Sequence, residues 1–173
     1  MKLIVDENNL YYGLFLENDN TGDILESKVL EEGFRKQNKR HITILGGSTK
    51  ELLKNILNKL SEEEKNNILK EIKGLLEDLR WVYTLKDIYK IQKQGYFNDS
   101  NILENRESFI SMIDMPDMEI FYNKLNSLLK TNLPVQVPHI TLFTKGEREN
   151  PNYYGIPVPS IQEFNNMNPE KIL

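Results

Sequence analysis

The residues of this sequence best suited to chemistry occur in two copies of one short motif. The chain has two histidines, and each is followed two residues later by a threonine, in His41-Ile42-Thr43 and His139-Ile140-Thr141. Successive side chains of a β-strand point to opposite faces, so residues two positions apart share a face, about 6.5 Å from each other. Each motif therefore predicts an imidazole beside a hydroxyl on one face of a strand.

Two such strands brought together would form a site for acid–base chemistry. An unperturbed histidine titrates near pH ~6.5, so one of His41 and His139 can be neutral while the other is protonated. The neutral ring can take a proton from an attacking oxygen, and the protonated ring can give one to a leaving oxygen. The hydroxyls of Thr43 and Thr141 can donate to the non-bridging oxygens of a phosphate, where charge builds up. The pattern favours phosphodiester cleavage without metal, and it leaves open which histidine is the acid.

The composition excludes several other kinds of site. The chain has no cysteine, which excludes disulfides, zinc–thiolate sites and a cysteine nucleophile. A metal held by the histidines would need nearby carboxylates, and neither motif has Asp or Glu within four residues. We therefore expect no metal and no cofactor. The net charge of −4 disfavours long nucleic acids and anionic membranes, so a small nucleotide or one RNA end is the expected partner.

Both motifs lie in segments whose residue pattern predicts a strand that ends at a glycine, over residues 40–45 and 135–145. Around them, the apolar spacing predicts further strands over 9–16, 80–85, 88–92 and 108–113, helices over 48–60, 62–77 and 116–129, and a short helix after residue 160. Residues 24–38 fit either a strand or a helix, and residues 95–105 predict a polar loop. Three capping boxes predict helix starts, at Ser48-Thr49-Lys50-Glu51, Ser61-Glu62-Glu63-Glu64 and Ser160-Ile161-Gln162-Glu163.

These elements predict one α+β domain over residues 1–173, because strands and helices are mixed and no Pro/Gly/Ser linker separates them. The strand and helix pattern around the first motif recurs around the second. We therefore expect two similar lobes, over about 9–80 and 81–173. The N-terminal apolar run is too short for a signal peptide, and no stretch reaches the roughly 18 apolar residues of a membrane span. The expected location is the cytoplasm.

The paired motifs, His-Ile-Thr-Ile and His-Ile-Thr-Leu about a hundred residues apart, resemble those of the 2H (two-histidine) phosphoesterase superfamily. This superfamily includes the 2′-5′ RNA ligase-like proteins and cyclic nucleotide phosphodiesterases, and the resemblance is best over 9–45 and 108–145. It implies two pseudo-symmetric lobes, with a central cleft between two antiparallel sheets flanked by helices. It also implies metal-independent action on 2′,3′-cyclic phosphates, 2′-5′ linkages or RNA ends. Many members have a proline before the motif, which Pro138 matches and Arg40 does not.

Further residues are candidate substrate contacts. Lys39 shares a strand face with His41, and Phe143 shares one with His139 and could stack on a base. Aromatic residues near the motif strands could form a stacking wall: Tyr11, Tyr12, Tyr153 and Tyr154. Core packing is the alternative for Phe143, and a place in the core or on the surface is the alternative for these tyrosines. Two other readings stay open, a nucleotide- or RNA-binding module without turnover and a structural domain with two incidental histidines.

Overall fold

The computed structural model describes residues 1–97, 102–147 and 155–173, and within these ranges it is an α+β fold with one eight-stranded sheet. This agrees with the expected fold class. The strands in chain order are β1 (Lys2–Asp6), β2 (Tyr11–Phe15), β3 (Arg35–Lys36), β4 (His41–Leu45), β5 (Thr84–Tyr96), β6 (Leu103–Asp114), β7 (His139–Gly146) and β8 (Glu170–Lys171).

The two motif strands lie side by side in the middle of the sheet. The strand order is β1-β2-β4-β7-β6-β5-β8, with β3 paired to β7, and these pairings are antiparallel. The resemblance implied two separate sheets, whereas this structure has one. The reason is that β4 and β7 pair with each other, through Ile42 opposite Ile140.

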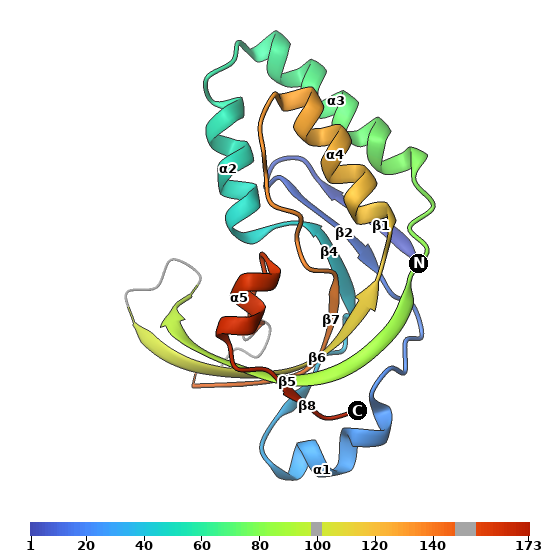
Figure 1. Ribbon diagram of the computed structural model, residues 1–173, viewed down its shortest axis with the longest axis vertical. Helices are drawn as coiled ribbons and strands as arrows, with labels where there is room; N and C mark the ends of the chain where they lie inside the picture. The colour runs from blue at the N-terminus through green and yellow to red at the C-terminus, as the bar shows by residue number, and fades with distance from the viewer. Residues whose placement is uncertain (98–101, 148–154) are drawn as a thin grey trace.

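Five α-helices and one 3-10 helix of the described ranges accompany the sheet: η1 (Asp23–Leu25), α1 (Glu26–Glu31), α2 (Gly47–Leu57), α3 (Glu62–Asp78), α4 (Asp117–Leu129) and α5 (Ile161–Asn166). Figure 1 shows α2, α3 and α4 gathered at one end of the molecule. In the same view α5 lies in the hollow of the curved β5–β6 ribbon, and α1 lies on its outer side. The two faces of the sheet are therefore covered by different helices.

Two apolar clusters pack on these two faces. The larger one joins the sheet to helices α1 to α4, with fully buried Leu53, Ile72 and Phe121 among its members. The smaller one lies beneath α5 and consists of Ile91, Ile110, Val137, Ile156, Val158, Phe164 and Met167. Burying one such large apolar side chain contributes about 1.5–3 kcal/mol. The smaller cluster holds α5 and residues 156–158 against the face of the sheet that carries the motif side chains, as shown below.

The predicted helix starts had mixed outcomes. The box at the start of α3 is confirmed, since Ser61 Oγ accepts from Glu64 N at 3.3 Å and the Glu64 carboxylate accepts from Ser61 N at 2.9 Å. At α5 the Ser160 hydroxyl accepts from the N–H of Glu163. The box at residues 48–51 is wrong, because α2 begins at Gly47 and its cap is Gly46, without a side-chain hydrogen bond. Ser48 is already helical there, and a capping residue has to be extended.

Several other elements differ from the expectation. The two short strands expected over 80–85 and 88–92 are one long strand, β5, with a register irregularity between Leu85 and Ile88. The expected polar loop over 95–105 is shorter, because the β5–β6 ladder continues to Tyr96 opposite Leu103. The last predicted strand begins at His139, since Pro138 has no N–H to donate to a ladder. The ambiguous residues 24–38 contain α1 and β3.

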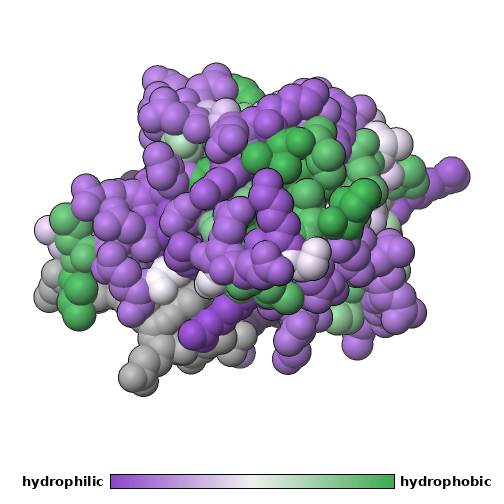
Figure 2. Space-filling model, turned by 90° about the horizontal axis from the view of Figure 1, so that it is seen from below, coloured by the Kyte–Doolittle hydropathy of each residue, from purple (hydrophilic) through white to green (hydrophobic). Residues whose placement is uncertain are grey.

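The surface seen from below in Figure 2 is mostly hydrophilic, with hydrophobic residues gathered in limited areas. Among the described residues, exposed large hydrophobics include Ile24, Val82 and Ile102, and single exposed side chains of this kind are normal. No helix in the described ranges combines the length and apolar character needed to cross a membrane.

Candidate functional site

The structure brings the two motifs together on one face of the sheet. The central isoleucines of the motifs are opposite each other in an antiparallel pair. Continuing that register by one residue in each direction places Thr43 opposite His139 and His41 opposite Thr141. Opposite residues on paired strands have Cβ atoms about 4.5–5.5 Å apart. Each imidazole therefore lies beside the hydroxyl of the other motif.

This face is the one that α5 covers. Thr141 lies opposite Ile110 and His139 opposite Met112 on β6, and both β6 residues belong to or pack against the smaller apolar cluster. A cavity of about 380 Å³ opens there, and all four motif side chains line it. The other described lining residues are Tyr11, Gln37, Gly46, Gly47, Gln136, Gly155, Ile156 and Pro157.

The chemistry of the cavity lining is unusual in one respect. Among its described lining residues there is no Lys, Arg, Asp or Glu, so the two imidazoles are the side chains that can carry a positive charge. A ligand in the cavity meets hydroxyls, amides and imidazoles. Such a lining suits a group that needs hydrogen bonds and proton transfer.

Both histidines are held by the same local contact. His41 Nδ1 lies 3.1 Å from the carbonyl oxygen of Lys39, and His139 Nδ1 lies 2.9 Å from that of Val137. A carbonyl oxygen can only accept, so Nδ1 of each ring carries the hydrogen. In the neutral ring the lone pair is therefore on Nε2, which makes Nε2 the atom for proton exchange with a ligand.

Burial separates the two histidines. His139 is 9 % exposed, whereas His41 is exposed to solvent at the cavity. Burial lowers the pKa of His139 below its ordinary value, and the charge of a protonated His41 lowers it further, against the opposing effect of the Val137 carbonyl. His139 is therefore neutral at neutral pH and ready to accept a proton.

Tyr11 is the predicted aromatic contact that the structure places at the cavity. Its hydroxyl lies 3.5 Å from Thr43 Oγ1, and its ring meets the His41 ring edge-on with centroids 6.2 Å apart. Burial raises the pKa of Tyr11, and the Thr43 hydroxyl only partly offsets this. The phenol therefore stays protonated and can orient the Thr43 hydroxyl.

Other predicted contacts are not brought to the cavity. Lys39 is exposed and contributes its carbonyl oxygen to His41, while its side chain is not among the lining groups. Tyr12 is fully buried in the larger apolar cluster, because it follows Tyr11 in the strand and points to the opposite face. Tyr153 and Tyr154 lie outside the described residues.

Phe143 is also in the core, and a bulge explains why the alternation failed to predict this. Ile110 of β6 is opposite Thr141, but the preceding residue, Phe109, is opposite Phe143. β7 thus has one residue more than β6 between these pairs, and an extra residue reverses the alternation beyond it. Phe143 is fully buried and meets Phe109 edge-on at 6.3 Å between centroids. Stacking on a base is therefore excluded for Phe143 in this conformation.

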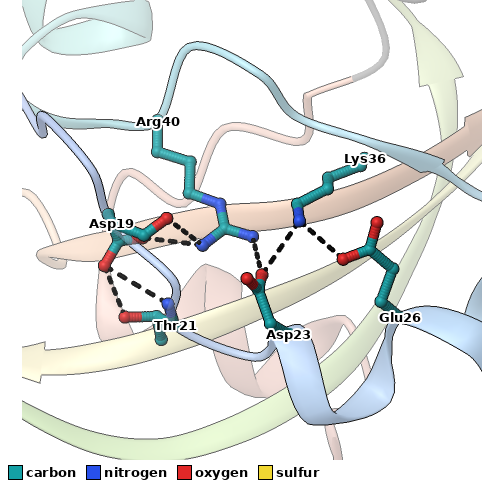
Figure 3. A network of polar contacts seen from close by, with 6 residues as sticks. All are labelled: Asp19, Thr21, Asp23, Glu26, Lys36 and Arg40. Atoms are coloured by element: carbon teal, nitrogen blue, oxygen red, sulfur yellow. Dashed lines mark hydrogen bonds and ion pairs between the residues drawn. The ribbon is translucent and has the colours of Figure 1, made fainter.

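An ion network, buried at Arg40 and partly exposed beyond it, anchors the chain immediately before the first motif (Figure 3). Arg40 is 3 % exposed and donates to the carboxylate and the carbonyl oxygen of Asp19, both at 2.9 Å, and to Asp23 at 3.1 Å. Lys36 then bridges Asp23 at 3.1 Å and Glu26 at 2.6 Å. The network ties the start of β4 to the turn before η1.

Seven of the described lining residues carry no direct sequence signal that assigns them to a site, and Gly46, Gly47 and Gln136 are among them. Gly46 and Gly47 predict the end of a strand, and two adjacent glycines at a strand-to-helix turn also permit close approach to a ligand. Gln136 is 5 % exposed and lies three residues before His139. The available sequence signal for Gln136 is that it is a polar residue three positions before His139.

Comparison with known proteins gives no match. No protein-family model, no curated protein and no solved structure matches this chain. Function has therefore to be inferred from the chain's own residues.

Other parts of the described structure offer less chemistry. A second cavity, of about 400 Å³, lies between the β1–β2 turn, α2 and α3, and its lining includes Lys50, Lys54 and Lys65 but neither histidine. In the described ranges no three His, Asp or Glu side chains are grouped closely enough to hold a metal ion. The paired motifs remain the strongest candidate site.

Proposed function

We propose that this protein is a metal-independent phosphodiesterase that acts on a small nucleotide or an RNA end. The substrate would carry a 2′,3′-cyclic phosphate or a 2′-5′ linkage. The observation that supports this proposal best is the register of β4 and β7, which puts two His–Thr pairs on one face and around one cavity. The resemblance of both motifs to those of the 2H phosphoesterases supports the same reaction class.

In the proposed hydrolysis, His139 is the base and His41 is the acid. His139 Nε2 takes a proton from the attacking water while the water oxygen forms a bond to phosphorus. The bond between phosphorus and the ribose oxygen breaks, and the protonated Nε2 of His41 gives its proton to that oxygen. The product is a phosphomonoester with a free ribose hydroxyl. Proton exchange with solvent returns His139 to the neutral form and His41 to the protonated form.

The hydroxyls of Thr43 and Thr141 have a different role in this proposal. Each would donate a hydrogen bond to a non-bridging phosphate oxygen, where negative charge increases in the transition state. Their positions opposite His139 and His41 let one phosphate meet an imidazole and a hydroxyl from each side. Tyr11, 3.5 Å from Thr43 Oγ1, would keep the Thr43 hydroxyl aimed at the phosphate.

The proposal includes an internal pseudo-two-fold arrangement of two lobes around the cavity. On one side of the β4–β7 junction the strand order outward is β4, β2, β1, and on the other it is β7, β6, β5. In each set the outer two strands form an antiparallel hairpin, and the chain then passes through a helix before it enters the motif strand. This order supports two related halves, each contributing one motif to a shared cleft.

Turnover of defined substrates in the presence of excess chelator tests the proposal. Nucleoside 2′,3′-cyclic phosphates and 2′-5′ oligonucleotides are incubated with the protein, and phosphomonoester product is measured by chromatography. We expect product with at least one of these substrates. The single variants His41→Ala and His139→Ala should each lower the rate by about 10²–10⁴-fold, with unchanged circular dichroism.

The possible results separate the readings of the sequence. Full activity in either histidine variant would overturn the acid–base assignment. Loss of activity in chelator that is restored by a metal ion would overturn the metal-independent mechanism. Nucleotide binding without turnover across the whole panel would instead indicate a non-catalytic nucleotide- or RNA-binding module on the same fold.

A further inference from the structure

The second cavity, of about 400 Å³, is a neighbour of the cavity that carries the motifs. Leu10 lines the second cavity, and the next residue, Tyr11, lines the motif cavity. α2 leads away from the end of β4 toward α3 (Figure 1), with Gly47 at its start in the lining of the motif cavity. Lys50, one turn further along α2, lines the second cavity. A ligand held at the motifs can therefore extend along α2 into the second cavity.

The two cavities differ in the charges of their linings. The described lining of the motif cavity has no Lys, Arg, Asp or Glu. The second cavity is lined by Lys50, Lys54 and Lys65, and also by two carboxylates, those of Glu7 and Glu62. Three ammonium groups against two carboxylates leave one positive charge, in a chain whose net charge is −4. Beside the motif cavity, the second cavity is therefore a place where an anion can find cationic partners.

The ammonium groups of the second cavity are available to a ligand. Lys54 lies 4.0 Å from Glu51 and Lys65 lies 3.6 Å from Glu62, and exposed ion pairs of this kind contribute about 0–1 kcal/mol. Half-buried Lys50 forms no ion pair with any described residue. A phosphate can therefore take these partners with little loss of existing contacts.

The rest of the lining suits the backbone of a nucleic acid better than its bases. Four asparagines line the second cavity, and its described lining has no aromatic side chain. Carboxamides donate to phosphate and sugar oxygens without reading the sequence, whereas unpaired bases are held by stacking on aromatic rings. A nucleic acid bound here would be held by its phosphates and sugars, whatever its sequence.

We propose that the second cavity binds the backbone of a short RNA chain whose terminal phosphate lies between the two motifs. Lys50 and Lys54 lie on one face of α2, about 4.5 and 10.5 Å beyond Gly47 along the helix axis, so they meet phosphates further along the chain than the reacting one. The inference deepens the proposed function and rests on it for the position of the reacting phosphate. It names an RNA end, and not a free mononucleotide, as the substrate class.

The double variant Lys50→Gln/Lys54→Gln tests the backbone contact. It removes two charges and keeps the helix, because Lys and Gln have similar helix propensities. Lys70→Gln/Lys73→Gln is the matched control, because it changes two exposed lysines of α3 that do not line the cavity. Binding of pentaadenylate with a 3′-phosphate and of adenosine 3′-monophosphate is measured by isothermal titration calorimetry, at salt concentrations from about 50 to 200 mM.

We expect Lys50→Gln/Lys54→Gln to weaken binding of the pentaadenylate roughly 2- to 30-fold and to leave binding of the mononucleotide unchanged. Each lost phosphate contact should also reduce the slope of log Kd against log salt concentration by about 0.7. Pentaadenylate binding as tight as in the control variant would overturn the proposal. Equal weakening for the mononucleotide would also overturn it, because the lysines would then act at the reacting phosphate.

Glu7→Gln tests the same cavity by a gain of binding, which a loss of folding cannot imitate. Glu7 is exposed and lines the cavity, so its removal takes away a charge that repels a phosphate. It should tighten binding of the pentaadenylate roughly 2- to 5-fold without changing that of the mononucleotide, and unchanged pentaadenylate binding would contradict a chain in this cavity. These measurements need no turnover. A protein that binds the pentaadenylate through this cavity but cleaves no substrate would therefore show a failure of the proposed activity alone.

Discussion

The two copies of the motif have the same local structure and different surroundings. In each, the ring Nδ1 contacts the carbonyl oxygen two residues earlier, at 3.1 Å for His41 and 2.9 Å for His139. His41 is exposed, is preceded by Arg40 with its ion network, and is followed by the start of α2. His139 is buried and follows Pro138.

This difference indicates that burial, and not the motif itself, lowers the pKa of His139. Two identical motifs in identical surroundings would have no preferred direction for proton transfer. The lowered pKa of His139 keeps this ring in the neutral form at neutral pH, in which Nε2 has a lone pair free for a proton.

The largest expected effect is a loss of turnover in histidine variants, and chemical rescue by imidazole should distinguish His41 from His139. His41→Gly and His139→Gly should each lower turnover of a 2′,3′-cyclic nucleotide by about 10²–10⁴-fold. Added imidazole should restore more activity to His41→Gly, because the place of His41 is open to solvent and that of His139 is enclosed. Initial rates at rising imidazole concentration measure this, with the unsubstituted protein as control. Equal rescue of both variants would contradict the difference in burial.

The next effect concerns the residue before each motif. Arg40→Met should lower the free energy of unfolding by about 3 kcal/mol, since removing one partner of a buried ion pair leaves Asp19 uncompensated. Pro138→Ala should cost about 1 kcal/mol or less, mainly by giving the unfolded chain more freedom. Urea denaturation measures both.

Asp23→Asn is the control for this pair, because the Asp23 side chain is 41 % exposed and exposed ion pairs contribute about 0–1 kcal/mol. An Arg40→Met variant as stable as Asp23→Asn would show that the network does not anchor β4.

A smaller effect follows from the lowered pKa of His139. The unfolded histidine titrates near pH ~6.5 and the folded one lower, so below pH ~6.5 the unfolded state binds more protons. The free energy of unfolding should therefore be highest above this pH and fall as the pH is lowered from 7.5 to 5.5. Aspartates such as Asp23 and Asp87 have lowered pKa values and titrate in more acidic solution. Urea denaturation across this range should show a smaller fall for His139→Gln, and an equal fall would contradict the assignment.

The motif strands and most helices could be predicted from the sequence, because the local residue patterns there agree with the fold. Alternation around His41 predicted that His41 and Thr43 share a face, and both line the cavity. The capping box at Ser61 predicted the start of α3, since both partners of the box are local. These are features that neighbouring residues alone can determine.

The failures come from contacts between distant parts of the chain. The bulge that turns Phe143 into the core is defined by the pairing of β7 with β6, which no local pattern reveals. The long strand β5 depends on its ladder with β6, which accommodates polar residues that predicted a loop. The place of Gly46 in the cavity lining depends on its close approach to the methyl group of Thr43, and the place of Gln136 there depends on the assembly of distant segments.

The smallest effect tests whether Tyr11 assists only the β4 side of the site. Tyr11→Phe keeps the ring beside His41 and removes the hydroxyl 3.5 Å from Thr43 Oγ1. Loss of one long hydrogen bond should lower kcat by roughly 2- to 10-fold. Lys39→Ala is the control and should leave kcat unchanged, because its side chain does not line the cavity. Because burial raises the pKa of Tyr11, we expect the phenol to orient Thr43 without ionising. A loss above about 100-fold lies in the range of general acid–base groups. Such a loss would contradict the orienting role and indicate that Tyr11 is a proton donor.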